Sequence, residues 1–251
     1  MSTSSNASRA AAMLLLLGKA GVAGAALKDL SEELQDAKPA VLRCLNALIE
    51  FGFAEQVARG RYRLGPSIFS LARSDGAVQV EVARWRSVLE EIADTLGQTV
   101  YLVRRAGLDV VIVDMQVGTS PVQALISGIG GRLPMGIGAG SVSILATLDR
   151  ANWTDIVRRN AKKYPNWKLD TEIVSKQVEQ ATVRGHAYDS GLLIPECAGL
   201  AVPIRERGQY ESDLSLTLSV PKSFFDISQP GEVASRIKNI IEKAQQGRSK
   251  T

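Results

Sequence analysis

The sequence predicts an α/β (α+β) protein with two domains, a small helical domain with a β-hairpin and a larger domain of helices on an antiparallel sheet. The first observation is that two helix-like segments and a short hairpin follow one another within residues 27–64, which is the order of a winged helix-turn-helix. The second is that strand-like and helix-like patterns alternate from residue 85 to residue 247. A chain of 251 residues is long enough for two such domains.

The first domain is expected to span residues 9–72, after a polar tail at residues 1–8 that we expect to be disordered. Residues 9–20 are predicted to form an amphipathic helix. Its apolar run, residues 10–17, is much shorter than the roughly 20 residues that cross a bilayer. The run resembles the apolar region of a secretory signal only superficially, because Lys19 cuts the apolar stretch short. With only two cysteines in the chain, we expect a cytoplasmic protein without a membrane partner.

Apolar residues recur at helical spacing in residues 27–34 and again in residues 41–49, which predicts two helices joined by a tight turn. Pro39 suits the first turn of the second helix, and Gly52 suits its C-terminal cap. The stretches 53–57 and 61–64 then form a hairpin with Gly60 in its turn.

The helical pattern lapses at residues 74–76, so residues 73–84 are assigned to a linker helix region. A helix is predicted over residues 78–96, and an antiparallel pair of strands over residues 99–103 and 109–115. Further helices are predicted at residues 141–148, 152–164, 171–184 and 231–246, and strands at residues 199–205 and 213–220. Asn152 and Asp170 are the expected N-caps of the second and third of these helices.

The second helix of the helix-turn-helix carries side chains that suit base edges and phosphates. The N-terminal residues of such a helix enter the major groove, where Lys and Arg reach guanine or phosphate, Asn reaches adenine and Ala touches a thymine methyl. The candidate DNA-contacting residues on this helix are Lys38, Pro39, Ala40, Leu42, Arg43 and Asn46.

Three arginines in the hairpin, Arg59, Arg61 and Arg63, alternate and are expected on one face of an extended strand, against phosphate. Residues 38–63 hold +3 of the chain's formal charge of +4. The alternative is that these are solvated charges of a small domain that docks to protein.

Two weaker patterns point to a ligand pocket. Residues 128–141 contain six glycines before a predicted helix, so backbone N–H groups can converge on a carboxylate. The spacing does not match a nucleotide-binding loop, and the glycines can equally serve a tight crossover. The strand at residues 213–220 alternates leucine and valine with Asp213, Ser215, Thr217 and Ser219. Its hydroxyl face is more commonly exposed to solvent, but can also line a polar pocket.

Groups for catalysis are scarce. The chain has one histidine, His186, and two cysteines, Cys44 and Cys197, which show no triad spacing and are too few for a His or Cys metal cluster. We therefore expect no enzyme activity, no catalytic residue, no metal and no cofactor. The rival hypothesis is a hydrolase or transferase that uses Cys197 or His186.

These residues together resemble the IclR family of bacterial transcriptional regulators, from about residue 9 to residue 243. The similarity rests on "AKPAVLRCLNALIEFGFAEQ" and "GRYRLGPSIFSLA" in the first domain, and on "GGRLPMGIGAGSVSILAT", "GLAVPI" and "SLTLSVP" in the second. The chain departs from the family pattern at Gly136, Ser141, Val142, Leu192 and Glu196.

The resemblance implies a DNA-binding homodimer or homotetramer whose GAF-like C-terminal domain, residues 85–247, binds a small organic acid. The backbone N–H groups of Ala139 and Gly140 would hold the carboxylate, and Thr217 and Ser219 would bond it from the opposite strand. The implied effector-binding residues are Val122, Leu125, Leu133, Ala139, Gly140, Asp189, Gly199, Thr217 and Ser219.

The expected function is a ligand-responsive, sequence-specific regulator that binds double-stranded DNA at a palindromic operator as a homo-oligomer. An aliphatic or aromatic carboxylate is the expected effector. The alternative is an effector-independent DNA-binding regulator whose C-terminal domain only oligomerises.

Overall fold

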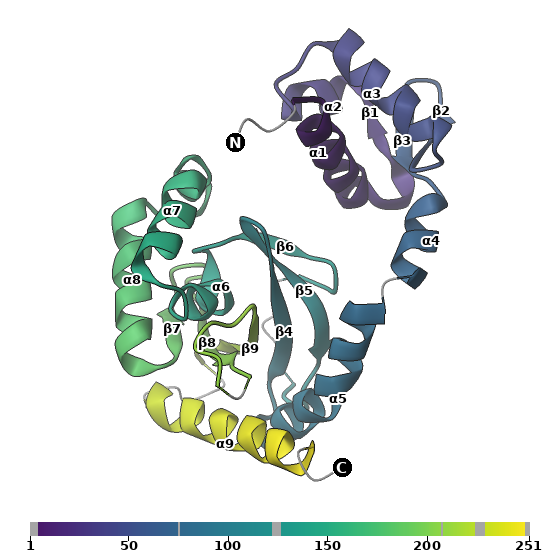
Figure 1. The fold of residues 1–251 in the computed structure, drawn as a ribbon. Coiled ribbons are helices and arrows are strands. Elements are labelled where there is room, and N and C mark those ends of the chain that lie inside the picture. The colour runs from purple at the N-terminus through teal and green to yellow at the C-terminus, as the bar shows by residue number, and fades with distance from the viewer. Residues whose placement is uncertain (1–4, 75, 122–126, 207, 224–228, 249–251) are drawn as a thin grey trace. The chain divides into compact units, whose positions relative to one another are not determined.

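The structure is a computed structural model, and it describes residues 5–74, 76–121, 127–206, 208–223 and 229–248. The chain divides into two compact units, Met1–Ala77 and Val78–Thr251, which are described separately (Figure 1). No helix in the described part is long and apolar enough to span a membrane.

The first unit is a winged helix-turn-helix, as predicted. Its three-stranded antiparallel sheet has the order β1-β3-β2, and its core includes Met13, Leu17, Leu30, Leu45 and Tyr62. The elements are α1 (Ser5–Ala20), the 3₁₀ helix η1 (Gly21–Ala23), β1 (Ala25–Ala26), α2 (Leu27–Glu33), α3 (Lys38–Glu50), β2 (Ala54–Ala58), β3 (Arg61–Leu64) and α4 (Ser67–Ser74).

The first helix is longer than predicted, because α1 begins at Ser5. The expectation of a disordered tail is therefore wrong for residues 5–8. The Asn6 side chain accepts a hydrogen bond from Arg9 Nη1 at 2.7 Å within this first turn. Such a contact between residues three apart stabilises a helix end.

The second unit is a six-stranded antiparallel sheet of order β6-β5-β4-β9-β8-β7, covered by helices on both faces. The elements are α5 (Gly76–Leu96), β4 (Thr99–Ala106), β5 (Asp109–Gln116), β6 (Arg132–Pro134), α6 (Gly138–Leu145), α7 (Arg150–Asn160), the 3₁₀ helix η2 (Ala161–Trp167), α8 (Thr171–Arg184), β7 (Ala187–Ser190), β8 (Cys197–Ile204), β9 (Leu214–Pro221) and α9 (Pro230–Arg248).

The two faces of this sheet pack against different helices, as the alternation of the strands requires. On one face, Val100 and Leu102 of β4 and Leu216 and Leu218 of β9 pack against α5 and α9. On the other face, Tyr101 and the neighbouring apolar residues pack against α6, α7 and α8. The hydroxyl side chains of β9 belong to this second face, which positions the pocket described below.

Several predicted boundaries need correction. Helix α6 begins at Gly138 rather than at residue 141. Helix α7 is capped by Asp149, whose carboxylate accepts the N–H of Asn152 at 2.7 Å, so Asn152 is not the N-cap. The strands β6 and β7 were not predicted. Asp170 caps α8 as predicted, accepting the N–H of Ile173 at 2.8 Å.

Candidate functional site

The candidate DNA-binding surface is the exposed face of α3. Val41, Leu45 and Leu48 are buried on the opposite face of the same helix, where they pack into the core of the first unit. The candidate DNA-contacting residues therefore share the face of α3 that points away from this core. Lys38, Pro39, Leu42, Arg43 and Asn46 are exposed, and Ala40 is partly buried.

An ion pair lies just before the first turn of α3. Arg9 of α1 donates to the Asp36 carboxylate in a close contact. This hydrogen bond is the main reason why the pKa of Asp36 lies below its usual value, and the more distant charge of Arg43 lowers it further. The Asp36 carboxylate is thus held in its charged form between α2 and α3, with its charge balanced by Arg9. Sequence reasoning missed this pair, because its partners are 27 residues apart.

The three hairpin arginines differ in their surroundings, which corrects the sequence-based expectation. Arg59 lies in the turn between β2 and β3, not on the strand face, and it is exposed. Arg61 Nη1 donates to the carbonyl oxygen of Gly24 at 2.8 Å. Arg63 Nε donates to Glu55 Oε1 at 2.6 Å, so its charge is paired.

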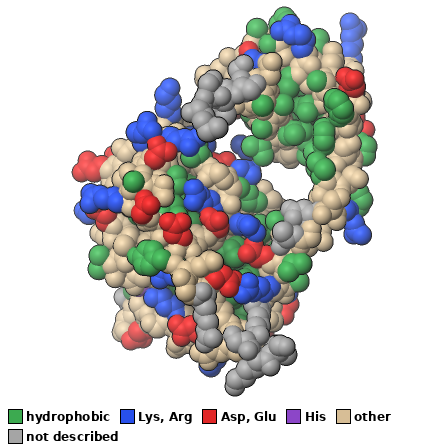
Figure 2. Space-filling view, viewed as in Figure 1, with side chains coloured by type: hydrophobic (Ala, Val, Ile, Leu, Met, Phe, Trp, Pro, Cys, Tyr) green, Lys and Arg blue, Asp and Glu red, His purple; other side chains and the backbone are tan. Residues whose placement is uncertain are grey.

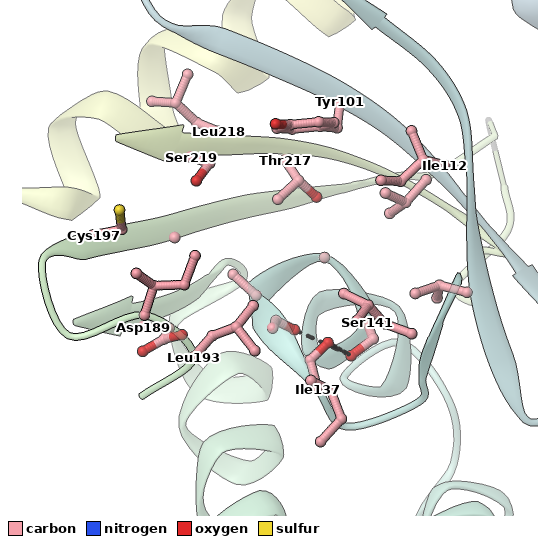
Figure 3. A pocket seen from close by; sticks show the side chains of 18 of the residues that line it. Tyr101, Ile112, Ile137, Ser141, Asp189, Leu193, Cys197, Thr217, Leu218 and Ser219 are labelled. Atoms are coloured by element: carbon pink, nitrogen blue, oxygen red, sulfur yellow. Dashed lines mark hydrogen bonds between the residues drawn. The ribbon is translucent and has the colours of Figure 1, made fainter. Parts of the chain in front are cut away.

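The predicted pocket residues meet in one cavity of about 50 Å³ in the second unit (Figure 3). Strands β4, β7, β8 and β9 form one wall, and the first turn of α6 forms the facing wall. The predicted residues that line it are Leu133, Ala139, Gly140, Asp189, Gly199, Thr217 and Ser219. Val122 and Leu125 lie outside the described residues.

The first turn of α6 offers backbone N–H groups to this cavity. Its N-cap residue is Ile137, which has no side-chain hydrogen bond to the turn, and the turn contains no acidic residue. Free N–H groups and the helix dipole both favour an anion at such an end. Because α6 begins at Gly138, Ala139 and Gly140 belong to this first turn, whereas the predicted start at residue 141 would have left them in the loop.

Gly140 lets α6 approach the sheet closely. A Cβ atom at this position would lie 2.5 Å from Thr217 Oγ1 and 2.9 Å from Val103 Cγ2. The Thr217 hydroxyl therefore lies directly beside the backbone of the α6 first turn. Among the described residues, Thr217 Oγ1 is buried and has no hydrogen-bond partner. A buried unpaired hydroxyl costs about 1–3 kcal/mol, so a ligand that pairs with it gains that energy back.

The hydroxyl face of β9 is buried, so the more common outcome, an exposed face, is wrong here. Every residue of β9 is buried. Ser215 Oγ accepts from Ser143 Oγ at 2.7 Å, and Thr217 and Ser219 line the cavity. Figure 3 shows these last two side chains between β9 and the side of the pocket formed by α6 and Asp189.

Asp189 brings a carboxylate into the wall of the pocket. It is only 6% exposed, and burial is the main reason why its pKa lies above the usual value. Its Oδ1 accepts the N–H of Leu192 at 2.7 Å, which fixes the turn that carries the pocket residue Leu193. Asp189 therefore both lines the cavity and holds the segment that covers part of it.

Sequence reasoning found Leu133 and Ala139 but missed most of the apolar lining. Tyr101 and Val103 enter the cavity from β4, and Ile112 enters from β5. The alternation of these strands could have shown which side chains share a face, but not which face carries the pocket. The remaining lining residues that were not predicted are Val110, Gly131, Ile137, Gly138, Ser141, Leu193, Ile194, Cys197, Ala198 and Leu218.

The candidate catalytic groups lie in settings that do not activate them. Burial lowers the pKa of His186, whose Nδ1 lies 3.2 Å from the carbonyl oxygen of Arg184. Burial raises the pKa of the Cys197 thiol, which keeps it protonated. The described residues contain no group of three His, Cys, Asp or Glu side chains that could hold a metal ion.

Family models match both units. Residues 7–58 match the IclR helix-turn-helix domain, and residues 79–246 match the bacterial transcriptional regulator IclR C-terminal domain. The HTH-type transcriptional regulator Rv1719 of Mycobacterium tuberculosis is 30% identical over 182 residues, which cover 71% of this chain and 69% of that protein. KipR of Bacillus subtilis is 32% identical over 115 residues, 45% of each protein.

Solved structures share the fold over nearly the whole chain. An IclR transcriptional regulator from Alicyclobacillus acidocaldarius has a TM-score of 0.73 at 25% identity, covering 98% of this chain and 99% of its own. An IclR homologue from Microbacterium hydrocarbonoxydans, solved in complex with 4-hydroxybenzoate, has a TM-score of 0.71 at 16% identity, covering 97% of this chain and 100% of its own. The two family models together span most of the sequence. The chain therefore belongs to the IclR family of DNA-binding bacterial transcriptional regulators.

Proposed function

We propose that this regulator binds a palindromic operator as a homo-oligomer and that a small organic acid, held in the pocket of the second unit, changes its affinity for that operator. The observation that carries the effector part is the uncapped first turn of α6 beside the unpaired Thr217 hydroxyl. Two kinds of donor, backbone N–H and hydroxyl, converge there on the space that a carboxylate would fill.

Contact with DNA is assigned to α3 and the hairpin turn. Lys38, Arg43 and Asn46 are exposed on one face of α3, and such a helix presents side chains to base edges in the major groove. Arg59 is exposed in the turn of the hairpin and is assigned to a phosphate. Over the face of the second unit that Figure 2 shows, basic and acidic side chains are interspersed, which favours the first unit as the source of attraction to DNA.

The experiment has two stages and uses the full chain. Selection of bound sequences from random duplex DNA is expected to return a symmetric site with two half-sites. Operator affinity is then measured by fluorescence anisotropy with and without a panel of small carboxylates. We expect at least one acid to change the Kd. A folded protein whose operator affinity no acid changes, and to which no acid binds in calorimetry, would support an effector-independent regulator instead.

A further inference from the structure

One segment of the second unit departs from the mixed charge described above. Residues 150–168, which form α7, η2 and the residue after them, contain six basic residues and one acidic residue, so their formal charge is +5. The whole chain has a formal charge of +4, and residues 38–63, with α3 and the hairpin, hold only +3 of it. The six residues that we call the α7–η2 basic surface are Arg150, Arg158, Arg159, Lys162, Lys163 and Lys168.

These six side chains lie away from the core of the second unit. The opposite side of α7, which includes Ile156, is buried in that core. Arg158 and Lys162 are four residues apart, a spacing that places two residues on the same face of a helix. All six residues of the surface are exposed. Their charges are therefore presented together to the solvent.

Two of the carboxylates that contact this surface are each shared by two cations. Asp155 contacts both Arg158 and Arg159. Asp109, at the start of β5, contacts Lys163 at 3.2 Å and is also paired with a cation from β6. One negative charge balances only one of the two positive charges in each case, so a surplus remains.

The other three cations are balanced even less. Arg150 pairs with Glu179 at 3.6 Å, but both side chains are more than half exposed, and ion pairs of this kind contribute little. Lys162 and Lys168 make no ion pair with a residue that the structure describes. The surplus of positive charge is therefore real in the folded protein and not removed by local pairing.

The scaffold beneath these charges is firmly held. Tyr164 of η2 is fully buried, and its hydroxyl donates to the carbonyl oxygen of Met135 at 2.9 Å. Asn160, at the end of α7, is also fully buried, and its Nδ2 donates to the carbonyl oxygen of Leu108 at 2.7 Å. These buried contacts fix α7 and η2 to the rest of the unit, so little order has to be gained when a partner binds.

Helix chemistry accounts for only part of the charge. Arg158 and Arg159 lie in the last turn of α7, where cations interact favourably with the helix dipole. Lys162, Lys163 and Lys168 lie beyond that turn. Like charges four residues apart, such as Arg158 and Lys162, repel each other. A bound polyanion would remove this repulsion.

The composition of the surface indicates which polyanion it suits. None of the large apolar side chains that are exposed in the described part of the chain lies within residues 150–168. A protein partner is held mainly by apolar and aromatic residues at the centre of an interface, and a membrane by apolar side chains inserted among the headgroups. Nucleic-acid phosphates need only cations. Because the second unit is covalently joined to a DNA-binding unit, it also meets duplex DNA at a high effective concentration.

We propose that the α7–η2 basic surface binds the phosphate backbone of duplex DNA beside the operator, outside the half-sites that α3 reads. The contact adds affinity and salt dependence without sequence specificity, because phosphates carry no sequence information. The first unit still selects the operator. The inference rests on the DNA-binding part of the proposed function and is independent of its effector part.

The test compares two duplexes by fluorescence anisotropy of the full chain over a series of salt concentrations. One duplex is the selected operator alone, and the other adds about 21 base pairs, two helical turns, on each side. Combined Arg158→Gln and Lys162→Gln should lower the slope of log Kd against log salt by about 1.8 on the long duplex, since each phosphate contact contributes about 0.9. The slope on the short duplex should not change.

Two further double variants control for charge and for folding. Arg236→Gln with Lys243→Gln removes two exposed charges from α9 and is expected to leave both slopes unchanged. Arg158→Lys with Lys162→Arg keeps both charges and is expected to retain the slope of the unaltered protein. Equal Tm values show that the variants are folded.

The outcomes separate this inference from its alternatives. An unchanged slope on the long duplex in the folded glutamine variant of α7 and η2 overturns the proposal. An equal loss on both duplexes places the contact within the operator and overturns the flanking position. Binding of poly-glutamate that this variant loses, with both DNA slopes unchanged, overturns the proposal in favour of an acidic protein partner. A selection that returns no bound duplex overturns the proposed function itself, before any variant is compared.

Discussion

Helices α3 and α6 both begin without a side-chain cap, but in opposite surroundings. The N-cap of α3 is Ala37 and that of α6 is Ile137, and neither first turn contains an acidic residue. Helices α7 and α8, by contrast, are capped by Asp149 and Asp170. An uncapped helix start leaves N–H groups that attract an anion. Lys38 and Pro39, which begin α3, are exposed, whereas Ala139 and Gly140 in the first turn of α6 are buried against the sheet.

This difference in burial predicts that the two sites respond differently to single substitutions. At the exposed surface of α3, water and salt screen each contact, so affinity for DNA is spread over several side chains. In the buried pocket at α6, electrostatic interactions are less screened and packing is tight. One added carbon atom should therefore damage the α6 site more than the loss of one whole side chain damages the α3 surface.

The largest expected effect is that of Gly140→Ala. Its Cβ would lie under 3 Å from both Thr217 and Val103, and such overpacking costs about 3 kcal/mol. We expect a lower Tm of the second unit and no heat of binding with any acid that binds the unaltered protein. Thermal unfolding and calorimetry measure the two effects.

The matched control is Gly231→Ala, because a Cβ at Gly231 meets nothing within 4 Å. If Gly140→Ala unfolds at the same temperature as this control and still binds acid, then α6 does not approach the sheet as closely as described, and the contrast with α3 is lost.

Next in size is the effect of Arg43→Ala on DNA binding. Arg43 is exposed on α3, and loss of a contact to a base edge costs about 2 kcal/mol and relaxes specificity at one position. Anisotropy with the selected operator and with single-base variants measures both. Arg236 is an exposed arginine on α9, so Arg236→Ala is the control for the loss of one positive charge from the protein. Equal losses on all sequences would assign Arg43 to a phosphate instead of a base.

A smaller effect distinguishes the hairpin arginines from one another. Arg59 is exposed in the turn, while Arg63 is paired with Glu55. Removal of one phosphate contact lowers the slope of log Kd against log salt by about 0.9. We expect this change for Arg59→Ala and none for Arg63→Ala, measured between low and moderate salt concentrations. The reverse order would mean that the Glu55 pair opens when DNA binds.

The sequence predicted those features that depend on local patterns. The bounds of α8 and its cap Asp170 follow from helical periodicity and cap chemistry, and the exposed face of α3 follows from the buried positions Val41 and Leu45. The short strand β6 has three residues, too few for a period to emerge. The pairing of Arg61 with Gly24 joins residues 37 apart, and no local pattern contains it.

The burial of the hydroxyl face of β9 shows the same limit more clearly. Alternation establishes that Ser215, Thr217 and Ser219 share a face, but a face that meets water and a face that meets a helix have the same alternation. Only the close approach of α6, through Gly140 and Gly199, decides between them. The glycines were noticed in the sequence, whereas their partners come from strands far along the chain.

The smallest expected effect is a dependence of folding stability on pH. It is expected to differ between the second unit, which contains α6, and the first unit, which contains α3. His186 follows α8 and is the single histidine of the chain. Burial, followed by the charges of Lys238 and Arg184, holds its pKa below the usual 6.5. A lowered histidine pKa means that the stability it contributes is present above pH 6.5 and is lost as pH falls through the folded-state pKa. Asp36 in the first unit has a lowered pKa too, but its contribution is lost only below about pH 4, near the unfolded value of a carboxyl group.

Between pH 7 and pH 5, therefore, the His186 contribution should weaken the second unit, and Asp36 should leave the first unit unaffected. Buried Asp189 has the opposite effect on the stability of the second unit. Its pKa is raised, so its ionisation at higher pH lowers stability. The difference in Tm between His186→Gln and the unaltered protein, followed over this range, isolates the histidine. The ring resonances of this single histidine report its pKa directly by NMR. A titration midpoint at or above 6.5 would show that the ring is solvated, and would remove this distinction between the two units.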